Sequence, residues 1–366
     1  MNIIQWMKSF LLGRSQRVLV DGVISSAADV VSGVPQGTVL GPLLFLVYIN
    51  DLPSVTSEGT KVKLFADDSA VYREIRTPQD CLILQKDIDN LQKWEKDNFM
   101  EFHPDKCQLL RVTNKRNPLL HNYVIHNQVV QNAEHVKYLG VNISGNLSFN
   151  FHIDSICKKA HSTLSFLNRN FGNCTKEIKE NLYTSHVRPQ VEYCGAVWDP
   201  FTTRNINKLE AVQRRAARFV TSNYSHRQSV TVLLKKLNWH PLSERRAVSK
   251  VLLFYKACNN LVHIPLDHLH LTQGQTRKSN DYFIPFCRTD AHKYGFYTSS
   301  SKLWNSIPVP IRDLNSVESL HASLSNITLR CSYWSDLTFV MHSTHYCLIC
   351  SYLLLIIILC CFLSFF

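Results

Sequence analysis

Two adjacent carboxylates, Asp67 and Asp68, interrupt a β-prone stretch that runs from Lys61 to Tyr72. Before the pair, apolar residues alternate with lysines at the period of a β-strand, and an apolar run resumes after it. The pattern predicts a β-hairpin with Asp-Asp at its turn, where both carboxylates are accessible. Such oxygens suit Mg²⁺, which usually keeps waters and substrate phosphates in its shell. Asp also favours turns for structural reasons, so the dipeptide alone does not establish a metal site.

A glycine-rich segment, Ser32–Pro53, precedes this hairpin and predicts a loop that runs into an apolar helix starting near Pro42. In this order, loop, helix and hairpin resemble motifs B and C of the reverse transcriptases of non-LTR (LINE-type) retrotransposons, jockey-like elements especially. The matching residues are Gly33, Pro35, Gln36, Gly37, Gly41, Pro42 and Phe45 for motif B, and Phe65, Ala66, Asp67 and Asp68 for motif C. An ordered pair of motifs is far more specific than one short motif.

Two further segments extend the resemblance, which covers roughly residues 1–325. Glu101–Val112 resembles the motif D loop and strand, with Lys106 at the lysine that would protonate the leaving pyrophosphate. An exposed lysine beside a strand is an equally favoured alternative. His135–Ile143 resembles the primer-grip hairpin of motif E, in which Tyr138 would contact the primer end. A buried strand that carries an aromatic residue is the alternative there.

The resemblance implies an RNA-directed DNA polymerase, a nucleotidyltransferase with Mg²⁺ as cofactor and with an RNA template, a DNA primer and dNTPs as partners. The implied catalytic residues are Asp67, Asp68 and Lys106, and the two aspartates are the implied metal ligands. The implied nucleotide-binding residues are Gln36 and Gly37. The implied template–primer residues are Phe65, Ala66, Tyr138, Leu139 and Gly140.

One part of the family pattern is missing from this sequence. The family uses three metal-binding aspartates, and the first lies on an apolar strand before motif B. The acids that precede motif B here are Asp21, in an Asp-Gly turn between short strands, and Asp29, in an Ala-Asp-Val run. Neither fits that strand, and two carboxylates without the third would leave bound metal ions under-neutralised. We therefore expect a polymerase fragment, truncated at the N-terminus and inactive alone.

The charge distribution favours a polyanionic partner. The chain has 366 residues, enough for about two domains, and a formal net charge of +12. Between Arg204 and Lys256 there are twelve Lys and Arg residues against two acids, Glu210 and Glu244. Such a concentration is typical of nucleic-acid binding, although a solvated charged face is the alternative. A helix predicted over Arg204–Val220 carries the nucleic-acid ridge. The ridge residues are Lys208, Arg214, Arg215 and Arg218.

We expect an α+β fold, in which a partial reverse-transcriptase palm of antiparallel hairpins and helices precedes a mostly α-helical thumb and connector. The predicted divisions are residues 1–145 for the palm with motifs B to E, 146–260 for the helical region with the ridge, 261–330 for a loop-rich region and 331–366 for a tail. The predicted helices are residues 1–12, a helix beginning at Thr77, His152–Asn170, Lys176–Tyr193, Arg204–Val220 and Arg245–Asn260. Cys81, Leu84, Ile88, Leu91 and Trp94 recur at helical spacing and predict a core face.

The tail differs in kind, because residues 347–366 carry no charge and have the length of a membrane helix. A tail-anchored membrane protein, with membrane contact through 347–366, is therefore an alternative function, less favoured than flanking sequence unrelated to the family. A non-catalytic nucleic-acid-binding remnant is the other alternative. Cys347 and Cys350 with His342 and His345 lack the spacing of a zinc site. The twelve scattered cysteines favour reduced thiols and an intracellular location, cytoplasmic or nuclear. The sequence does not indicate an oligomeric state.

Overall fold

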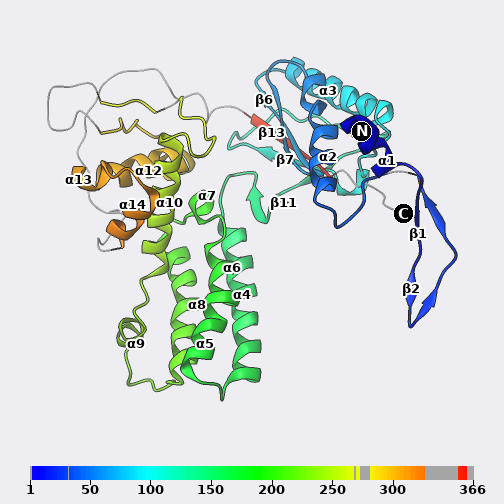
Figure 1. The fold of residues 1–366 in the computed structure, drawn as a ribbon. Helices are drawn as coiled ribbons and strands as arrows, with labels where there is room; N and C mark the ends of the chain where they lie inside the picture. Colours follow the sequence, from blue (N-terminus) through cyan, green and yellow to red (C-terminus); the bar gives the residue numbers. More distant parts are fainter. Residues whose placement is uncertain (1, 32, 268, 273–280, 326–352, 361–366) are drawn as a thin grey trace. The chain divides into compact units, whose positions relative to one another are not determined.

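The structure is a computed structural model that describes residues 2–31, 33–267, 269–272, 281–325 and 353–360 (Figure 1). The chain divides into two compact units. Unit 1 contains residues 1–138, 144–146 and 351–366, and unit 2 contains residues 139–143 and 147–350. Helices occur together with antiparallel hairpins, so the expected α+β class is confirmed at that level. The palm and thumb assignments, like the four sequence divisions, stay predictions.

Unit 1 begins with a helix and two small antiparallel strand pairs. These elements are α1 (Ile3–Leu11), β1 (Arg14–Gln16) paired with β4 (Ala28–Val30), and β2 (Leu19–Val20) paired with β3 (Val23–Ile24). The turn between β2 and β3 consists of Asp21 and Gly22, whose φ angles are 49° and 83°. Two consecutive positive φ angles match the twist of a two-residue hairpin turn, which explains the Asp-Gly dipeptide.

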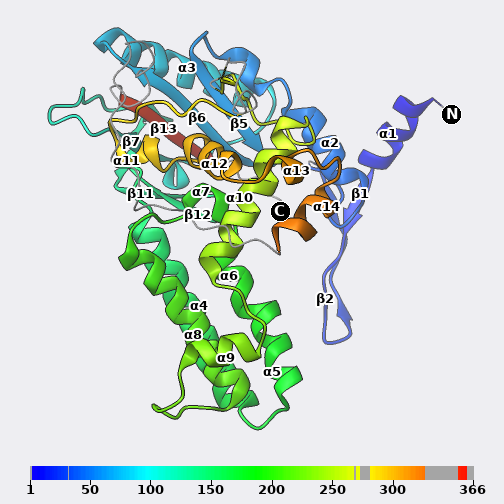
Figure 2. The same cartoon turned by 90° about the vertical axis from the view of Figure 1, so that its left-hand side faces the viewer.

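A five-stranded sheet forms the centre of unit 1, with the strand order β10-β7-β13-β6-β5. Four of these strands, β7, β13, β6 and β5, lie side by side in Figure 2. Its strands are β5 (Thr60–Phe65), β6 (Asp68–Ile75), β7 (Gln108–Val112), β10 (Gln131–Ala133) and β13 (Leu353–Cys360). β13 is antiparallel to both of its neighbours, β6 and β7, whereas β10 is parallel to β7. The C-terminal strand therefore lies near the middle of a sheet whose other strands come from the first 133 residues.

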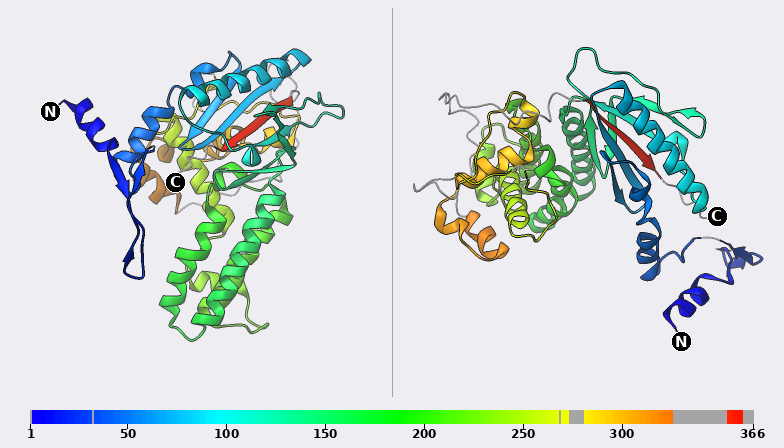
Figure 3. Two further views of the ribbon diagram at one scale, coloured as in Figure 1. Left: turned by 90° about the vertical axis from the view of Figure 1, so that its right-hand side faces the viewer. Right: turned by 90° about the horizontal axis from the view of Figure 1, so that it is seen from above.

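The helix α3 (Pro78–Asp97) lies across one face of this sheet (Figure 3). The predicted core face is confirmed, because the five residues named for it are all buried: Cys81, Leu84, Ile88, Leu91 and Trp94. They share a hydrophobic core with Val71, Ile75 and Leu109 from the sheet. The helix start is also as predicted. The Asp80 carboxylate accepts hydrogen bonds from the backbone N–H groups of Arg76 and Thr77.

The remaining elements of unit 1 are short, apart from one apolar helix. They are α2 (Leu40–Ile49), the 3₁₀ turns η1 (Leu52–Val55) and η2 (Pro104–Lys106), and the strand pair β8 (Val124–Ile125) with β9 (Gln128–Val129). The hairpin of β11 (His135–Tyr138) and β12 (Val141–Ser144) carries the chain into unit 2. The apolar helix expected near Pro42 is therefore present, but it begins two residues earlier.

Unit 2 is helical. Its elements are α4 (Asn150–Phe171), α5 (Lys176–Leu182), η3 (Tyr183–Val187), α6 (Arg188–Glu192), α7 (Gly195–Trp198), α8 (Thr203–Thr221), α9 (Val230–Lys236), α10 (Leu242–Cys258), α11 (Asp290–Lys293), α12 (Phe296–Asn305), α13 (Val309–Arg312) and α14 (Val317–Leu324). The helix predicted over Lys176–Tyr193 is interrupted, because η3 is a π-helical turn just before Pro189. Proline has no N–H and its ring clashes with the carbonyl four residues earlier, so the turn widens there.

The region 261–330, expected to be loop-rich, contains the four helices α11 to α14 after residue 290. They are short, with four to ten residues each, so their sequences show too few turns for a clear helical period. α12 and α14 pack on α10 in one core that includes Phe254 and Trp304.

Within the described residues, no helix combines the length and the apolar character needed to span a membrane. In the apolar tail, residues 353–360 form the strand β13 rather than a helix. The rest of 347–366 lies outside the described residues. So do the four residues considered for zinc, Cys347, Cys350, His342 and His345.

Candidate functional site

The predicted acidic hairpin is present, but its turn lies one residue earlier than expected. β5 and β6 are antiparallel with Phe65 opposite Asp68, and the two-residue turn between them is Ala66-Asp67. Ala66 has a φ of 51°, which is uncommon for a residue with a Cβ atom. Asp67 is therefore a turn residue and is exposed, while Asp68 is the first residue of β6 and is half-buried. Both carboxylates lie at the tip of a hairpin whose strands are anchored in the core.

The strand register separates two faces of the hairpin. Lys63 lies opposite Ala70 and Phe65 lies opposite Asp68, so these residues share one face. The other face carries Val62 and Leu64, which pack against the core beneath α3. The tip face thus combines a carboxylate, a cationic strand and the ring of Phe65, whose exposed fraction is 63%. An exposed ring beside cations is suited to stacking with a nucleobase.

A second segment, far away in sequence, reaches the same tip. Tyr138 is the last residue of β11, and its pKa is raised, first by burial and then by the negative charges of Asp68 and Tyr72. The fold of unit 1 therefore brings Tyr138 close enough to Asp68 for the carboxylate charge to act on the phenol. Tyr138 comes from the predicted primer grip, and Asp68 comes from the acidic hairpin.

The turn of the predicted primer-grip hairpin consists of Leu139 and Gly140, with φ angles of 45° and 83°. Within unit 2, the Tyr193 hydroxyl donates a hydrogen bond to the Leu139 carbonyl at 3.1 Å. A Cβ atom at Gly140 would lie 3.0 Å from Cε1 of Tyr193. Glycine at this position is explained by both the backbone angle and the close ring.

The glycine-rich loop forms a tight turn before α2. The Thr38 hydroxyl donates to the Pro35 carbonyl at 2.7 Å and accepts from the Gly41 N–H at 3.1 Å. Gln36 and Gly37 are exposed, and a Cβ atom at Gly37 would meet no atom within 4 Å. The loop therefore leaves space beside Gly37, as close approach of a ligand to the backbone requires. Their nucleotide-binding role stays a prediction.

Lys106 ends the 3₁₀ turn η2 just before β7, and it is exposed. The loop-then-strand arrangement expected for motif D is present. The role of Lys106 in proton transfer stays a prediction, since its position in a loop serves a surface lysine equally well.

The described residues contain no cluster of three or more His, Cys, Asp or Glu side chains able to hold a metal ion. Asp67 and Asp68 thus form a two-carboxylate group in the part of the chain that the structure describes. Two hard oxygen donors suit Mg²⁺ or Mn²⁺ when water and phosphate oxygens complete the coordination shell.

Residues 1–143 match the protein family described as reverse transcriptase (RNA-dependent DNA polymerase). That range contains the acidic hairpin, the glycine-rich loop and Tyr138. This segment is therefore similar to reverse transcriptases, and the chain resembles the polymerases of jockey-like, non-LTR elements.

Curated relatives extend the match beyond the family segment. The RNA-directed DNA polymerase from mobile element jockey of Drosophila melanogaster is 28% identical over 226 residues, which are 59% of this chain and 24% of that protein. The probable RNA-directed DNA polymerase from transposon X-element of Drosophila melanogaster is 29% identical over 223 residues, 59% of this chain and 24% of that protein. The chain spans about a quarter of the length of these relatives. No solved structure matches it.

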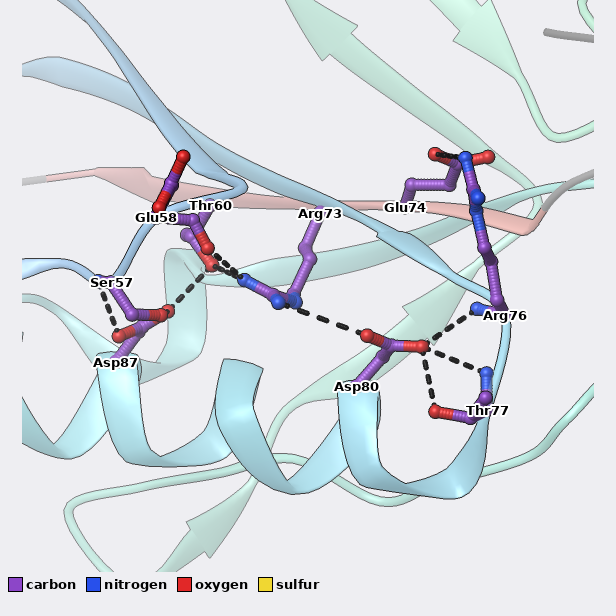
Figure 4. Close-up of polar contacts among 9 residues, drawn as sticks. All are labelled: Ser57, Glu58, Thr60, Arg73, Glu74, Arg76, Thr77, Asp80 and Asp87. Carbon is purple, nitrogen blue, oxygen red and sulfur yellow. Dashed lines mark hydrogen bonds and ion pairs between the residues drawn. The ribbon is translucent and has the colours of Figure 1, made fainter. Parts of the chain in front are cut away.

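Sequence reasoning missed a network that fixes the base of the hairpin in this reverse-transcriptase segment (Figure 4). The carboxylate of Asp87, which is 1% exposed, accepts hydrogen bonds from the N–H and hydroxyl of Ser57, both at 2.8 Å, and from the Thr60 hydroxyl at 2.5 Å. Arg73 donates to that hydroxyl at 3.0 Å and lies 3.7 Å from Asp80. An acid between Leu84 and Ile88 on the apolar face of α3 was the available signal.

The predicted ridge lies on α8, and two of its arginines are more exposed to solvent than its other two residues. Arg214 and Arg215 are exposed, although Arg215 donates to the Ser165 hydroxyl at 2.9 Å. Lys208 is paired with Asp154, and Arg218 donates to the Ser225 carbonyl at 3.1 Å. The opposite face of α8 is buried, as its amphipathic pattern predicted.

Proposed function

We propose that this chain is a segment of an RNA-directed DNA polymerase whose acidic hairpin tip binds a divalent metal ion and the template–primer end. We further propose that it does not extend primers alone. The observation that carries the proposal is the acidic hairpin itself, with Asp67 exposed in its turn and Asp68 beside it at the start of β6. Relatives with polymerase names support the reaction class. The proposed inactivity is supported by the described residues, which hold no cluster of three metal-ligating side chains.

The metal ion proposed for this tip is Mg²⁺. When bound, it would lower the energy of negative charge on the transferring phosphoryl group. Asp67, exposed in the turn, would ligate the ion directly, and half-buried Asp68 would add negative charge and weaker ligation. Since the described residues contribute no third carboxylate, waters and nucleotide phosphates would complete the shell, and affinity without a nucleotide would be low.

The chain's own side chains would position the nucleic acid. The ring of Phe65 and the backbone of Ala66 would lie against the terminal base pair, and Tyr138 with Leu139 and Gly140 would hold the primer end. Gln36 and Gly37 would shape the nucleotide pocket; Gly37 permits close backbone approach because no atom stands where its Cβ would be. Lys106 would donate the proton to the leaving pyrophosphate.

A metal titration tests the carboxylate pair without requiring polymerase activity. Mn²⁺ serves as the probe, and its binding to the full chain is followed by electron paramagnetic resonance. We expect Asp67→Asn to weaken binding at least tenfold. Asp105→Asn is the matched control, because the Asp105 side chain is 83% exposed in a different loop and should not affect the site. Equal affinity in all three proteins would remove the metal site from the proposal.

Primer extension on poly(A)–oligo(dT) tests the restriction on activity. We expect no extension above background by the full chain. Robust extension that Asp67→Asn abolishes would show an active polymerase and would overturn the proposed inactivity, while leaving the metal site intact.

A second candidate function, nucleic-acid binding without catalysis, is favoured by the two exposed arginines of α8. Each phosphate that a protein neutralises steepens the dependence of log K on log salt by about 0.7 to 0.9. We expect the double variant Arg214→Gln, Arg215→Gln to reduce that slope by about 1.5 on single-stranded RNA. Lys208→Gln is the control, because that ammonium is already paired with Asp154. Binding that does not vary with salt would exclude this function.

A further inference from the structure

A buried charge cluster lies within unit 2, where three helices meet. α10 packs against both α7 and α12, and Asp199 is the residue that directly follows α7 (Figure 1). Nε of Arg246 donates to one carboxylate oxygen of Asp199 at 2.9 Å, and the Lys250 ammonium donates to the other oxygen at 2.9 Å. Lys250 also donates to the Ser299 hydroxyl of α12 at 3.1 Å. One carboxylate is therefore shared by two cations that lie one turn apart on α10.

The charges of this cluster do not balance, although the cluster is almost fully buried. The side chains of Arg246 and Lys250 are 2% and 1% exposed, and that of Asp199 is 7% exposed. Two positive charges and one negative charge leave a net charge of +1. Glu192 of the neighbouring helix α6 does not compensate it, because that carboxylate is paired with Arg245. Burying a charge without a counter-charge is strongly unfavourable, so the cluster calls for one more negative charge.

The guanidinium of Arg246 has hydrogen-bonding capacity left over. Its Nε is used by Asp199, but Nη1 and Nη2 are buried and have no hydrogen-bond partner within the described residues. The N–H groups of these two nitrogens form a planar fork that suits an anion. Buried donors without an acceptor are costly. The fork therefore indicates an acceptor that the described part of the chain does not supply.

The residues of α7 hold this guanidinium in place. A Cβ atom at Gly195 would lie 3.2 Å from Cγ and 3.3 Å from Cδ of Arg246, so glycine leaves room for the arginine stem against the helix. Cζ of Arg246 lies 5.9 Å from the centre of the Trp198 ring, within the range of a cation–π contact. Nε1 of Trp198 donates to the Tyr193 carbonyl at 2.8 Å, which fixes the ring. The fork is therefore positioned before any ligand arrives.

We propose that the Arg246 fork, with the positive charge of Lys250 beside it, is a binding site for one small monovalent inorganic anion such as chloride. One such ion neutralises the net charge and accepts hydrogen bonds from Nη1 and Nη2. The ion must be small, because both nitrogens are closed off from solvent, and it enters through local opening of α7 and α12. When bound, it stabilises the packing of both helices on α10. The site uses neither the ridge on α8 nor the acidic hairpin.

Hydrogen exchange of the full chain in sodium chloride and in sodium gluconate tests the site. The two solutions have the same ionic strength, so surface charges are screened equally, and gluconate is too large for a closed site. A ligand that binds only the folded state opposes its opening, so chloride should slow amide exchange in α10 and α12 at least about threefold. Exchange in α3 of unit 1 is the internal control and should not change. Equal exchange of α10 and α12 in both salts would overturn the proposal.

Removal of the fork should remove the effect of chloride. Arg246→Met takes away both terminal nitrogens, so exchange in α10 and α12 should become the same in the two salts. Arg245→Met is the matched control, because the neighbouring guanidinium is already paired with Glu192 and should leave the chloride effect unchanged. A chloride effect that survives in Arg246→Met would assign it to another part of the protein and would contradict the proposed site.

Asp199→Asn distinguishes an anion site from a purely structural ion pair, and it does so even if Arg246→Met does not fold. The change raises the net charge of the cluster from +1 to +2, so the chloride effect on exchange should grow at least about twofold. A structural role alone predicts faster exchange by the same factor in chloride and in gluconate, and that result would refute the proposal.

Chloride NMR measures binding directly, without reference to stability. Wild type and Arg245→Met should broaden the chloride signal equally, and Arg246→Met should broaden it less than half as much. Equal broadening by all three proteins would show that chloride binds only at the surface, which would remove the site. Neither NMR nor hydrogen exchange here uses a divalent metal ion or nucleic acid, so failure of this proposal and failure of the proposed function are separate outcomes.

Discussion

The two ends of the β5–β6 hairpin each lie beside a pair of carboxylates, and the two pairs have opposite surroundings. At the base, Asp80 and Asp87 reach the strands from α3, and each accepts three hydrogen bonds from nearby N–H or hydroxyl groups. At the tip, Asp67 is exposed in the turn and Asp68 is half-buried beside it. One end thus uses its acids to hold the hairpin on the helix, while the other exposes Asp67 in its turn.

The comparison shows how a single hairpin combines rigidity with accessible charge. A carboxylate out of water needs hydrogen bonds to remain ionised, and the network around Arg73 supplies them at the base (Figure 4). Because that end is fixed, the turn at the other end can hold Asp67 exposed to solvent, where a ligand can reach it.

The largest expected effect is at Asp87. Asp87→Ala removes the acceptor of three hydrogen bonds and leaves the Ser57 and Thr60 donors without it, so unit 1 should lose about 3 kcal/mol of stability. Urea unfolding of the full chain, followed by hydrogen exchange in β6 and α3, measures the loss. Asp89→Ala is the matched control, because Asp89 is exposed on the same helix and should change stability by less than about 0.5 kcal/mol. Equal losses of stability in Asp87→Ala and Asp89→Ala would show that the hydrogen bonds of Asp87 do not stabilise the base of the hairpin.

Asp80 should show a smaller effect that depends on pH. Burial opposes ionisation, but hydrogen bonds from Thr77 and Arg76 and the charge of Arg73 lower the pKa of Asp80 overall. A carboxyl with a lowered folded pKa stabilises the protein fully above its unfolded pKa, and the contribution is lost as the pH falls through the folded value. Asp80→Asn should therefore cost about 1 kcal/mol near pH 7 and progressively less below about pH 4.

Unfolding of wild type and Asp80→Asn across this pH range measures the difference. Glu74→Gln is the control, because Glu74 pairs with Arg76 at 2.9 Å where both side chains are more than a third exposed. Glu74→Gln should therefore leave the free energy of unfolding nearly unchanged at every pH. A stability difference for Asp80→Asn that stays constant into acid would show that its hydrogen bonds do not depend on ionisation.

The sequence predicted the acidic tip of the hairpin better than its base, because the patterns that indicate the tip are local in sequence. These patterns are the alternation in β5, with a period of two residues, the Asp-Asp dipeptide, and the buried face of α3, with a period of about 3.6 residues. The position of Asp87 on the apolar face of α3 indicates its burial, but its partners Ser57 and Thr60 meet it across the fold and cannot be identified from its neighbours in sequence.

The same limit applies to the apolar tail and to Tyr138. An uninterrupted apolar run has no period, so residues 353–360 read equally as part of a membrane helix or as a buried strand. The strand partners that decide between these, β6 and β7, lie in the first 112 residues. The family resemblance proposed that Tyr138 approaches the primer end, but its proximity to Asp68 is a property of the fold.

The turn itself allows a modest stabilising change. Ala66 has a φ of 51°, where a Cβ atom is strained, and glycine adopts this angle without that penalty. After allowing for the greater freedom of glycine in the unfolded chain, Ala66→Gly should stabilise unit 1 by about 0.5 kcal/mol. Ala70→Gly, at a buried position in β6, should instead destabilise it by about 1 kcal/mol. Thermal unfolding of both variants measures the contrast, and loss of stability in Ala66→Gly would show that the turn is not strained.

The smallest effect on stability is expected at the tip acids, where a different readout is needed. Asp67→Asn and Asp68→Asn should each change stability by less than about 0.5 kcal/mol, because neither charge is buried in the core. The negative charge of Asp68 disfavours the Tyr138 phenolate, so Asp68→Asn should lower the pKa of Tyr138. That pKa should stay above its ordinary value, since burial is the larger cause of the shift.

NMR titration of tyrosine-labelled protein measures this pKa, with Tyr138→Phe to assign the signal. Asp67→Asn is the internal control, because the carboxylate whose charge raises the pKa of Tyr138 is that of Asp68. If both variants lower the pKa of Tyr138 equally, the phenol senses the tip as a whole, and the separate roles proposed for a ligating Asp67 and a supporting Asp68 lose their basis. If only Asp68→Asn lowers it, the fold positions Tyr138 against one member of the pair, which leaves Asp67 available to a metal ion.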